Sequence, residues 1–252
     1  MIRIFLNILG LVTELGLIAV VVWLALNHPW WMAALTTAMT VILGGVLEWA
    51  RQRHEDSFYF GERNSFRLLL VGMSGVGEGL VKSLAAGVAV ILTFSGNDSE
   101  RILVLTAIFA ACLFLGTGIL RRGYYYYGVR PLRWGYFRLA MPLGIIFSLC
   151  VQSATSLGFL TVPSLQQIAG ALIFDLPARP SVEQLSDMAF NIRQTIDALV
   201  LDVAGRLLGE TYAPIVAVLM SVDVLIGFAL SVYVVAILEI VLRLEGERSG
   251  NP

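Results

Sequence analysis

The chain has 252 residues, of which 58% are hydrophobic and only 14% are charged, whereas a soluble domain carries roughly 25% charged residues. Its net charge of −1 excludes a strongly basic surface, so we expect no nucleic-acid partner. This composition predicts an integral membrane protein surrounded by the lipid bilayer. The apolar runs are about twice as long as the roughly ten-residue strands of a membrane barrel, so we expect an all-α fold.

Six stretches are long and apolar enough to cross a bilayer, which takes about 20 residues. In chain order they are 4–26, 31–50, 68–96, 102–120, 139–162 and 213–242. The first stretch begins with Arg3, as a signal peptide would, but its run is too long and contains Glu14, so we expect an uncleaved helix. The sequence therefore predicts a six-transmembrane-helix bundle.

Arginines alternate between the connections and so predict the orientation. Segment 51–67 contains four arginines and segment 121–138 contains five, whereas the connections on the opposite side contain few. Because cytoplasmic loops are enriched in Lys and Arg, we expect both termini in the cytoplasm and the protein in a bacterial cytoplasmic (inner) membrane. The chain then divides into helices one to five (1–162), an extracytoplasmic helical cap (163–212), and helix six with a cytoplasmic tail (213–252).

The cap segment is too long for a simple loop. Ser181 and Gln184 form a capping-box pattern that predicts the start of a helix. An apolar stripe follows at alternating three- and four-residue steps: Val182, Leu185, Ala189, Ile192, Ile196, Leu199, Val203 and Leu207. Asp202 and Arg206 are spaced to pair on the polar side, and 165–174 is expected to be a shorter re-entrant or interfacial helix.

Two interpretations of this long helix remain open. It is either a lid on the bundle or the membrane surface, or a docking surface through which 181–208 binds a second copy or other membrane subunits. In the second case Ile192 and Ile196 are contact residues. Tyr125 and Arg130 belong to an aromatic, arginine-rich segment that is either an interfacial belt or a contact for an anionic lipid or a partner.

The stretch 68–96 carries charges inside an apolar run. Glu78 and Lys82, the sole lysine of the sequence, are four residues apart and so share one helix face. A ridge of small residues on the same helix predicts close packing against a neighbour; its members are Gly72, Gly75, Gly79, Ser83 and Ala86. We expect this helix at the centre of the bundle, with the pair turned inward.

Counting along the helices places Glu14, Glu78 and Asp223 near the membrane midplane, with Lys82 and Gln152 about one turn further out. Three acids then face one lysine, which leaves two carboxylates without a basic partner. Such carboxylates are protonated, hydrated or bound to a cation. These five residues are therefore the predicted proton- or ion-binding set.

No motif of a soluble enzyme and no cofactor site is recognisable, so an enzyme is the less expected outcome. The leading hypothesis is a proton- or cation-linked transporter or channel. The alternative is a non-catalytic assembly or accessory subunit of a larger membrane complex, in which the polar residues hold helices together. A second alternative is a membrane-embedded enzyme acting on a lipid-like substrate.

Overall fold

The structure is a computed structural model, and it describes residues 2–60, 65–95, 98–160, 181–209 and 212–249. These residues are all helical apart from short connections. The elements, in order, are α1 (Ile2–Asn27), α2 (Pro29–Phe60), α3 (Ser65–Phe94), α4 (Ser99–Tyr127), α5 (Pro131–Ser156), α7 (Val182–Leu208), α8 (Ala213–Met220), η1 (Val222–Leu225) and α9 (Ile226–Ser249). Six spans in the described part are long and apolar enough to cross a membrane. The predicted all-helical class and the six apolar helices are confirmed.

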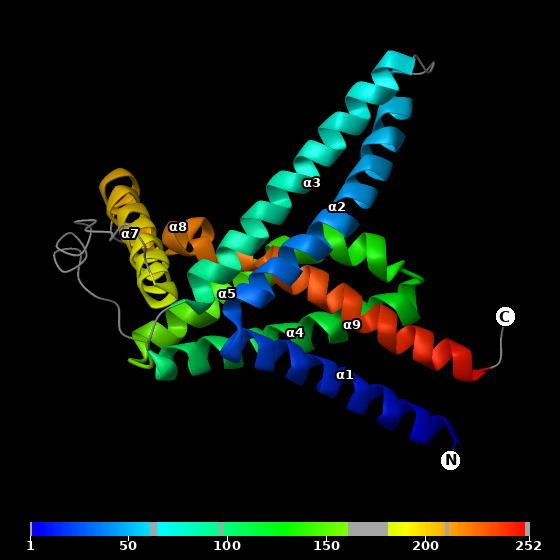
Figure 1. The fold of residues 1–252 in the computed structure, drawn as a ribbon, viewed down its shortest axis with the longest axis horizontal. Helices are drawn as coiled ribbons and strands as arrows, with labels where there is room; N and C mark the ends of the chain where they lie inside the picture. The colour runs from blue at the N-terminus through cyan, green and yellow to red at the C-terminus, as the bar shows by residue number, and fades with distance from the viewer. Residues whose placement is uncertain (1, 61–64, 96–97, 161–180, 210–211, 250–252) are drawn as a thin grey trace.

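The helix ends gather at two ends of the molecule (Figure 1). The start of α1, the tip of the α2–α3 hairpin, the turn between α4 and α5 and the last turns of α9 point one way. We call this the arginine-rich end, because the last turns of α2 and α4 and the α4–α5 connection carry Arg51, Arg53, Arg122 and Arg130. Helices α7 and α8 lie at the opposite end, the α7 end. Both termini are thus on the same side.

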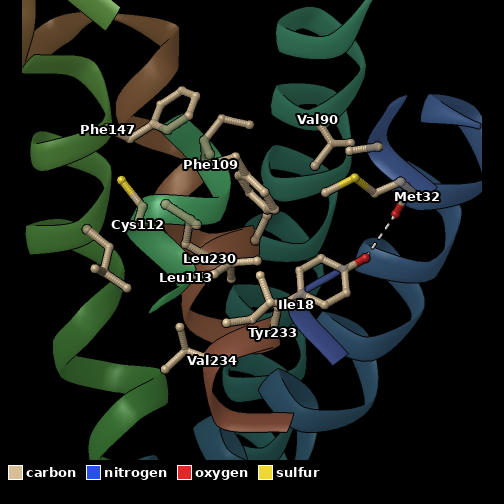
Figure 2. Close-up of a cluster of buried hydrophobic side chains, with 14 of the residues drawn as sticks. Ile18, Met32, Val90, Phe109, Cys112, Leu113, Phe147, Leu230, Tyr233 and Val234 are labelled. Carbon is tan, nitrogen blue, oxygen red and sulfur yellow. Dashed lines mark hydrogen bonds between the residues drawn. The ribbon is translucent and has the colours of Figure 1, made fainter. Parts of the chain in front are cut away.

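The bundle is centred on α9. In an 18-residue apolar window of Val222–Leu244, 72% of the residues are buried, against 39% in the corresponding window of Gly72–Phe94 in α3. Large side chains of neighbouring helices belong to the same buried cluster as α9, as Figure 2 shows for Phe109 of α4, Phe147 of α5 and Leu230 of α9. The rings of Phe94, Phe109 and Phe147 meet edge to face. The expectation that 68–96 forms the centre was wrong, because a hydropathy profile does not distinguish a helix surrounded by protein from one that also faces lipid.

Helices α5 and α9 approach each other closely at two glycines. A Cβ on Gly227 would overlap the carbonyl oxygen of Ala140 and lie 2.7 Å from the amide nitrogen of Gly144. A Cβ on Gly144 would in turn overlap the carbonyl oxygen of Val224. Backbone contact of this kind is possible only without side chains, as is usual for helices packed in lipid.

The predicted small-residue ridge of α3 does pack against a neighbouring backbone, and that neighbour is α2. A Cβ on Gly79 would lie 3.1 Å from the amide nitrogen of Gly45, and one on Gly75 would lie 3.0 Å from the Cα of Trp49. The two helices form an antiparallel hairpin that leans away from α1, α4 and α9 (Figure 1).

The sixth predicted span is broken. Helix α8 ends at Met220, Ser221 is extended (φ −61°, ψ 146°), and a 3₁₀ turn leads into α9. The expected continuous helix over 213–242 was therefore wrong, and only Val222–Leu244 qualifies as a span. The expected piece at 165–174 lies outside the described residues.

Candidate functional site

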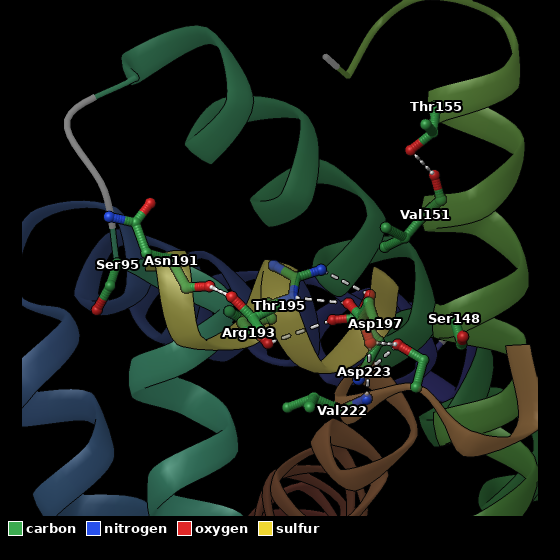
Figure 3. Close-up of polar contacts among 12 residues, drawn as sticks. Ser95, Ser148, Val151, Thr155, Asn191, Arg193, Thr195, Asp197, Val222 and Asp223 are labelled. Carbon is green, nitrogen blue, oxygen red and sulfur yellow. Dashed lines mark hydrogen bonds and ion pairs between the residues drawn. The ribbon is translucent and has the colours of Figure 1, made fainter. Parts of the chain in front are cut away.

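Asp223 lies directly after the break between α8 and α9, and its side chain is only 4% exposed. It is thus at the first residues of the last span, at the α7 end, and not at the midplane as the sequence predicted. Arg193 of α7 donates to Asp223 Oδ2 over 2.6 Å, and this guanidinium is 7% exposed. Thr93 Oγ1, from the end of α3, donates to Asp223 Oδ1 over 3.4 Å. Figure 3 shows Arg193 reaching from α7 toward Asp223.

Neighbouring helices satisfy the backbone groups that the break exposes. Asp197 of α7 accepts hydrogen bonds from Ser221 Oγ (2.9 Å) and from the Val222 amide (3.3 Å). Ser148 of α5 donates to the Val218 carbonyl at the end of α8 (2.9 Å). Unsatisfied groups at helix ends are costly away from water. These contacts therefore hold the break in place and fasten α7 to the bundle.

Asp197 is the titratable group of this site that lies outside the membrane-spanning segments. Burial raises the pKa of its carboxyl above the ordinary value, and the charge of Asp223 raises it further. Arg193, Ser221 and the Val222 amide act in the opposite direction and do not cancel the effect. The docked state of α7 consequently favours the protonated form of Asp197.

A second polar cluster lies between α2 and α3 in the hairpin. Lys82 donates to Glu48 and, over 2.7 Å, to Glu78, which confirms the predicted Glu78–Lys82 proximity. Arg51 bridges the same two acids, at 3.1 Å from Glu48 and 3.0 Å from Glu78. Glu48 is fully buried, whereas Glu78 is about one-third exposed. Arg51 also lies 3.5 Å from the more exposed Glu55, so two cations pair with three carboxylates in this cluster.

Glu14 occupies a third position, between α1 and α4. Its side chain is 5% exposed and lies 2.8 Å from Nη2 of Arg121, and Thr117 Oγ1 donates to the same carboxylate. Both partners are on α4, one turn apart. This contact joins the two helices by one charge pair and one hydroxyl.

The three predicted acids thus lie at three separate helix contacts, each beside at least one cation. The expectation that two carboxylates lack a basic partner was wrong, because Arg121 and Arg193 pair with Glu14 and Asp223. Gln152 is exposed on α5 and contributes to none of the three contacts.

Sequence reasoning missed Glu48, Arg51, Arg121 and Arg193 as members of these sites. Arg51 and Arg121 were assigned to connections, but α2 and α4 extend beyond the apolar runs and carry them as helical residues. Arginine reaches back along a helix with its long apolar stem. The spacing of Glu48 and Arg51, three residues apart, was the available signal for one pairing; nothing local indicated that Arg193 meets Asp223.

Helix α7 begins with the predicted capping box of Ser181 and Gln184, and Asp202 pairs with Arg206 as predicted, at 2.8 Å. Its face toward the bundle carries Arg193 and Ala204, both buried. The predicted apolar stripe lies beside that face: Ile192 is half-buried, and Ile196, Leu199, Val203 and Leu207 are exposed.

A cavity of about 310 Å³ opens at the arginine-rich end, in the turn between α4 and α5. It is lined by Val129, Arg130, Arg133, Trp134, Phe137 and Arg138. Tyr125, also a predicted contact residue, is 59% exposed nearby in sequence. Within the part of the chain that the structure describes, no three His, Cys, Asp or Glu side chains are grouped to hold a metal ion.

Comparison of the chain with protein-family models, with curated proteins and with solved structures finds no match.

Proposed function

We propose that this protein is a non-catalytic integral membrane subunit that assembles with another membrane-spanning chain through α7 and α8. The observation that carries the proposal is the orientation of α7. Its buried charged residues face the bundle, while its apolar stripe is exposed.

The spacing of residues on α7 separates three faces, since each residue advances about 100° around a helix. Arg193, Asp197 and Ala204 share the face toward the bundle. Ile196, Val203 and Leu207 lie roughly a quarter-turn to one side, Leu199 lies further round the helix, and the Asp202–Arg206 pair lies roughly opposite the bundle. A helix that only covered the bundle would bury its apolar stripe there. The exposed apolar stripe of α7 instead fits contact with another chain that lies in the membrane or at its surface.

Helix α8 also exposes apolar residues. Helices α7 and α8 pack against each other, and α8 exposes Ile215 (59%), Leu219 (46%) and Met220 (64%). Leu199 and Leu207 of α7 are 59% and 77% exposed. Exposed apolar side chains in this number, on two helices at one end of the molecule, are typical of protein or membrane contacts.

The charge arrangement also favours a structural role. Among the described residues, Glu14, Glu48, Glu78 and Asp223 each lie beside at least one cation, so none of these four carboxylates is left unpaired to bind a transported ion. We place the arginine-rich end in the cytoplasm and α7 on the extracytoplasmic side of a bacterial inner membrane, following the excess of arginines at the former.

A site-specific photocrosslinker at Val203 or Leu207, in cells that contain the native membrane, tests the proposal. We expect a discrete adduct with one membrane-spanning protein, identified by mass spectrometry. The matched controls are crosslinkers at Asp202 and Arg206, on the polar face of the same helix, which should give no adduct. Adducts with lipid alone at all apolar positions would contradict the assignment and make α7 an interfacial helix.

Ion- or proton-linked transport is a second candidate, favoured by the break in the sixth span. Transporters commonly place binding sites where a membrane helix is interrupted, and Asp223 lies at such an interruption. This candidate predicts gradient-dependent flux in liposomes that falls in Asp223→Asn or Glu78→Gln. Flux that is absent, or unchanged in both variants, would remove it. The enzyme alternative gains no such support, since no acidic residue lines the cavity at the α4–α5 turn.

A further inference from the structure

The cavity at the turn between α4 and α5 has an unusual charge. Three of its six lining residues are arginines, Arg130, Arg133 and Arg138, and none is acidic. All three arginines are exposed. No ion pair connects them to an acid within the described ranges, whereas Arg51, Arg121 and Arg193 each face a carboxylate. Three like charges around one small space repel one another unless an anion joins them.

The start of α5 adds to the positive potential. The helix begins at Pro131, and its N-cap residue Arg130 makes no side-chain capping hydrogen bond. The first backbone amides of a helix have no intrahelical acceptor, and the helix dipole is positive there. An anion at this position therefore receives hydrogen bonds from amides as well as from guanidinium groups.

Along one face of α5, the side chains change from charged near its start to apolar further along the helix. Arg130, Trp134, Phe137 and Arg138 are spaced by four, three and one residues and so share a face. Met141, three residues further, continues this face and is 61% exposed. Tyr126 and Tyr127, at the end of α4, are 80% and 84% exposed, as in the aromatic belt of a membrane interface. The site thus combines a positively charged group of side chains with an exposed apolar surface next to it.

We propose that this cavity binds the phosphate group of an anionic phospholipid. Arg130 and Arg133 hold the phosphate oxygens, because a guanidinium group matches a phosphate with paired hydrogen bonds. Arg138 neutralises the remaining charge of the headgroup, and the acyl chains lie along Trp134 and Met141. The site is independent of the assembly surface on α7 and α8, which lies at the opposite end of the molecule.

The test is native mass spectrometry of the purified chain titrated with phosphatidylglycerol, phosphatidylcholine or inorganic phosphate. We expect phosphatidylglycerol to bind about tenfold more tightly than phosphatidylcholine, and Arg130→Gln/Arg133→Gln to lose about tenfold in affinity for phosphatidylglycerol. The matched control is Arg122→Gln, because Arg122 is an exposed arginine of α4 at the same end that does not line the cavity. Its affinity should change less than about twofold.

Four outcomes would overturn the proposal: equal binding of the two lipids, an unaffected double variant, a control variant that loses as much as the double variant, or displacement of bound lipid by millimolar inorganic phosphate. The last result would assign the cavity to free phosphate. If the double variant does not purify as a single species, Arg138→Gln provides the same comparison, with the charge-retaining Arg138→Lys expected to recover most of the lost affinity.

Discussion

The packing around α9 and the packing of the α2–α3 hairpin differ in kind. Around α9, large apolar side chains such as Phe109, Leu230 and Val234 interlock and are fully buried. Between α2 and α3, glycines bring the backbones together, and four charged side chains meet at one level. Both helices of the hairpin expose apolar residues such as Ile42 (66%) and Val81 (67%).

This difference has a physical basis. In a bilayer, apolar side chains gain little by leaving lipid for protein, so helix association depends on close packing and polar contacts. Helix α9 obtains close packing from all sides. The hairpin obtains it from one partner helix and adds charge pairs. We therefore expect changes in side-chain volume to destabilise the bundle around α9, and the hairpin to tolerate such changes on its outer faces.

The charged contacts differ from each other as well. In the hairpin, Glu48 and Glu78 each have two cationic partners, Arg51 and Lys82. At the α7 end, Arg193 is the cation that pairs with Asp223 in the described structure. Removal of one cation should therefore lower stability more at the α7 end than in the hairpin.

The largest effect is expected from Gly227→Val at the α5–α9 contact. A side chain there would overlap the backbone of Ala140 and Gly144, which a rotamer change cannot relieve. We expect a loss of about 3 kcal/mol or more, measured as reduced thermal stability in detergent or failure to purify as a monodisperse species. The matched control is Gly118→Ala on α4, where a Cβ meets nothing within 4 Å; equal losses in both variants would contradict the packing argument.

A loss of about 3 kcal/mol is expected from Arg193→Gln, because it leaves the buried carboxylate of Asp223 without its cation. Helix α7 should then detach and become accessible to proteases. The double variant Arg193→Gln/Asp223→Asn should regain much of the stability, since no uncompensated charge remains. If it is as unstable as the single variant, the pair does not fasten α7.

A smaller loss, about 1–2 kcal/mol, is expected from Lys82→Met in the hairpin. Arg51 remains 3.1 Å from Glu48 and 3.0 Å from Glu78, so both acids keep a cation. Hydrogen exchange of the α2 and α3 amides measures the effect. A loss as large as that of Arg193→Gln would show that the two cations of the hairpin are not redundant.

The smallest effect concerns pH. The pKa of Asp197 is raised by burial in the docked state, so that state binds more protons than the detached state at pH values between the two pKa values. Docking of α7 should therefore strengthen as pH falls from neutrality toward the ordinary aspartate pKa of 3.8 and weaken as pH rises. Limited proteolysis of α7 across this range measures it. In Asp197→Asn, the docking of α7 should depend less on pH. An unchanged pH dependence in that variant would show that another group is responsible.

Much of the fold could be predicted from the sequence, because the relevant signals are local. The apolar runs marked the six spans, and the capping box marked the start of α7. The i, i+4 pairs Glu78–Lys82 and Asp202–Arg206 formed as their spacing predicted. Each of these features depends on residues within a few turns of one helix.

The site could not be predicted in the same way. Whether the chain breaks at Ser221 depends on hydrogen bonds to Asp197, on α7, and from Ser148, on α5. A serine inside an apolar run looks the same in a continuous helix as in an interrupted one. The partners of Glu14 and Asp223 are likewise on other helices.

The sequence by itself determined which segments are helical, where α7 begins and which charges share a helix face, since backbone geometry fixes neighbours within a helix. Only the tertiary structure decided that α9 is central, that Arg121 and Arg193 neutralise two of the buried acids, and that α7 exposes its apolar stripe. The physical reason is that lipid and protein interior are equally apolar, so hydrophobicity alone does not determine which face of a membrane helix meets which neighbour.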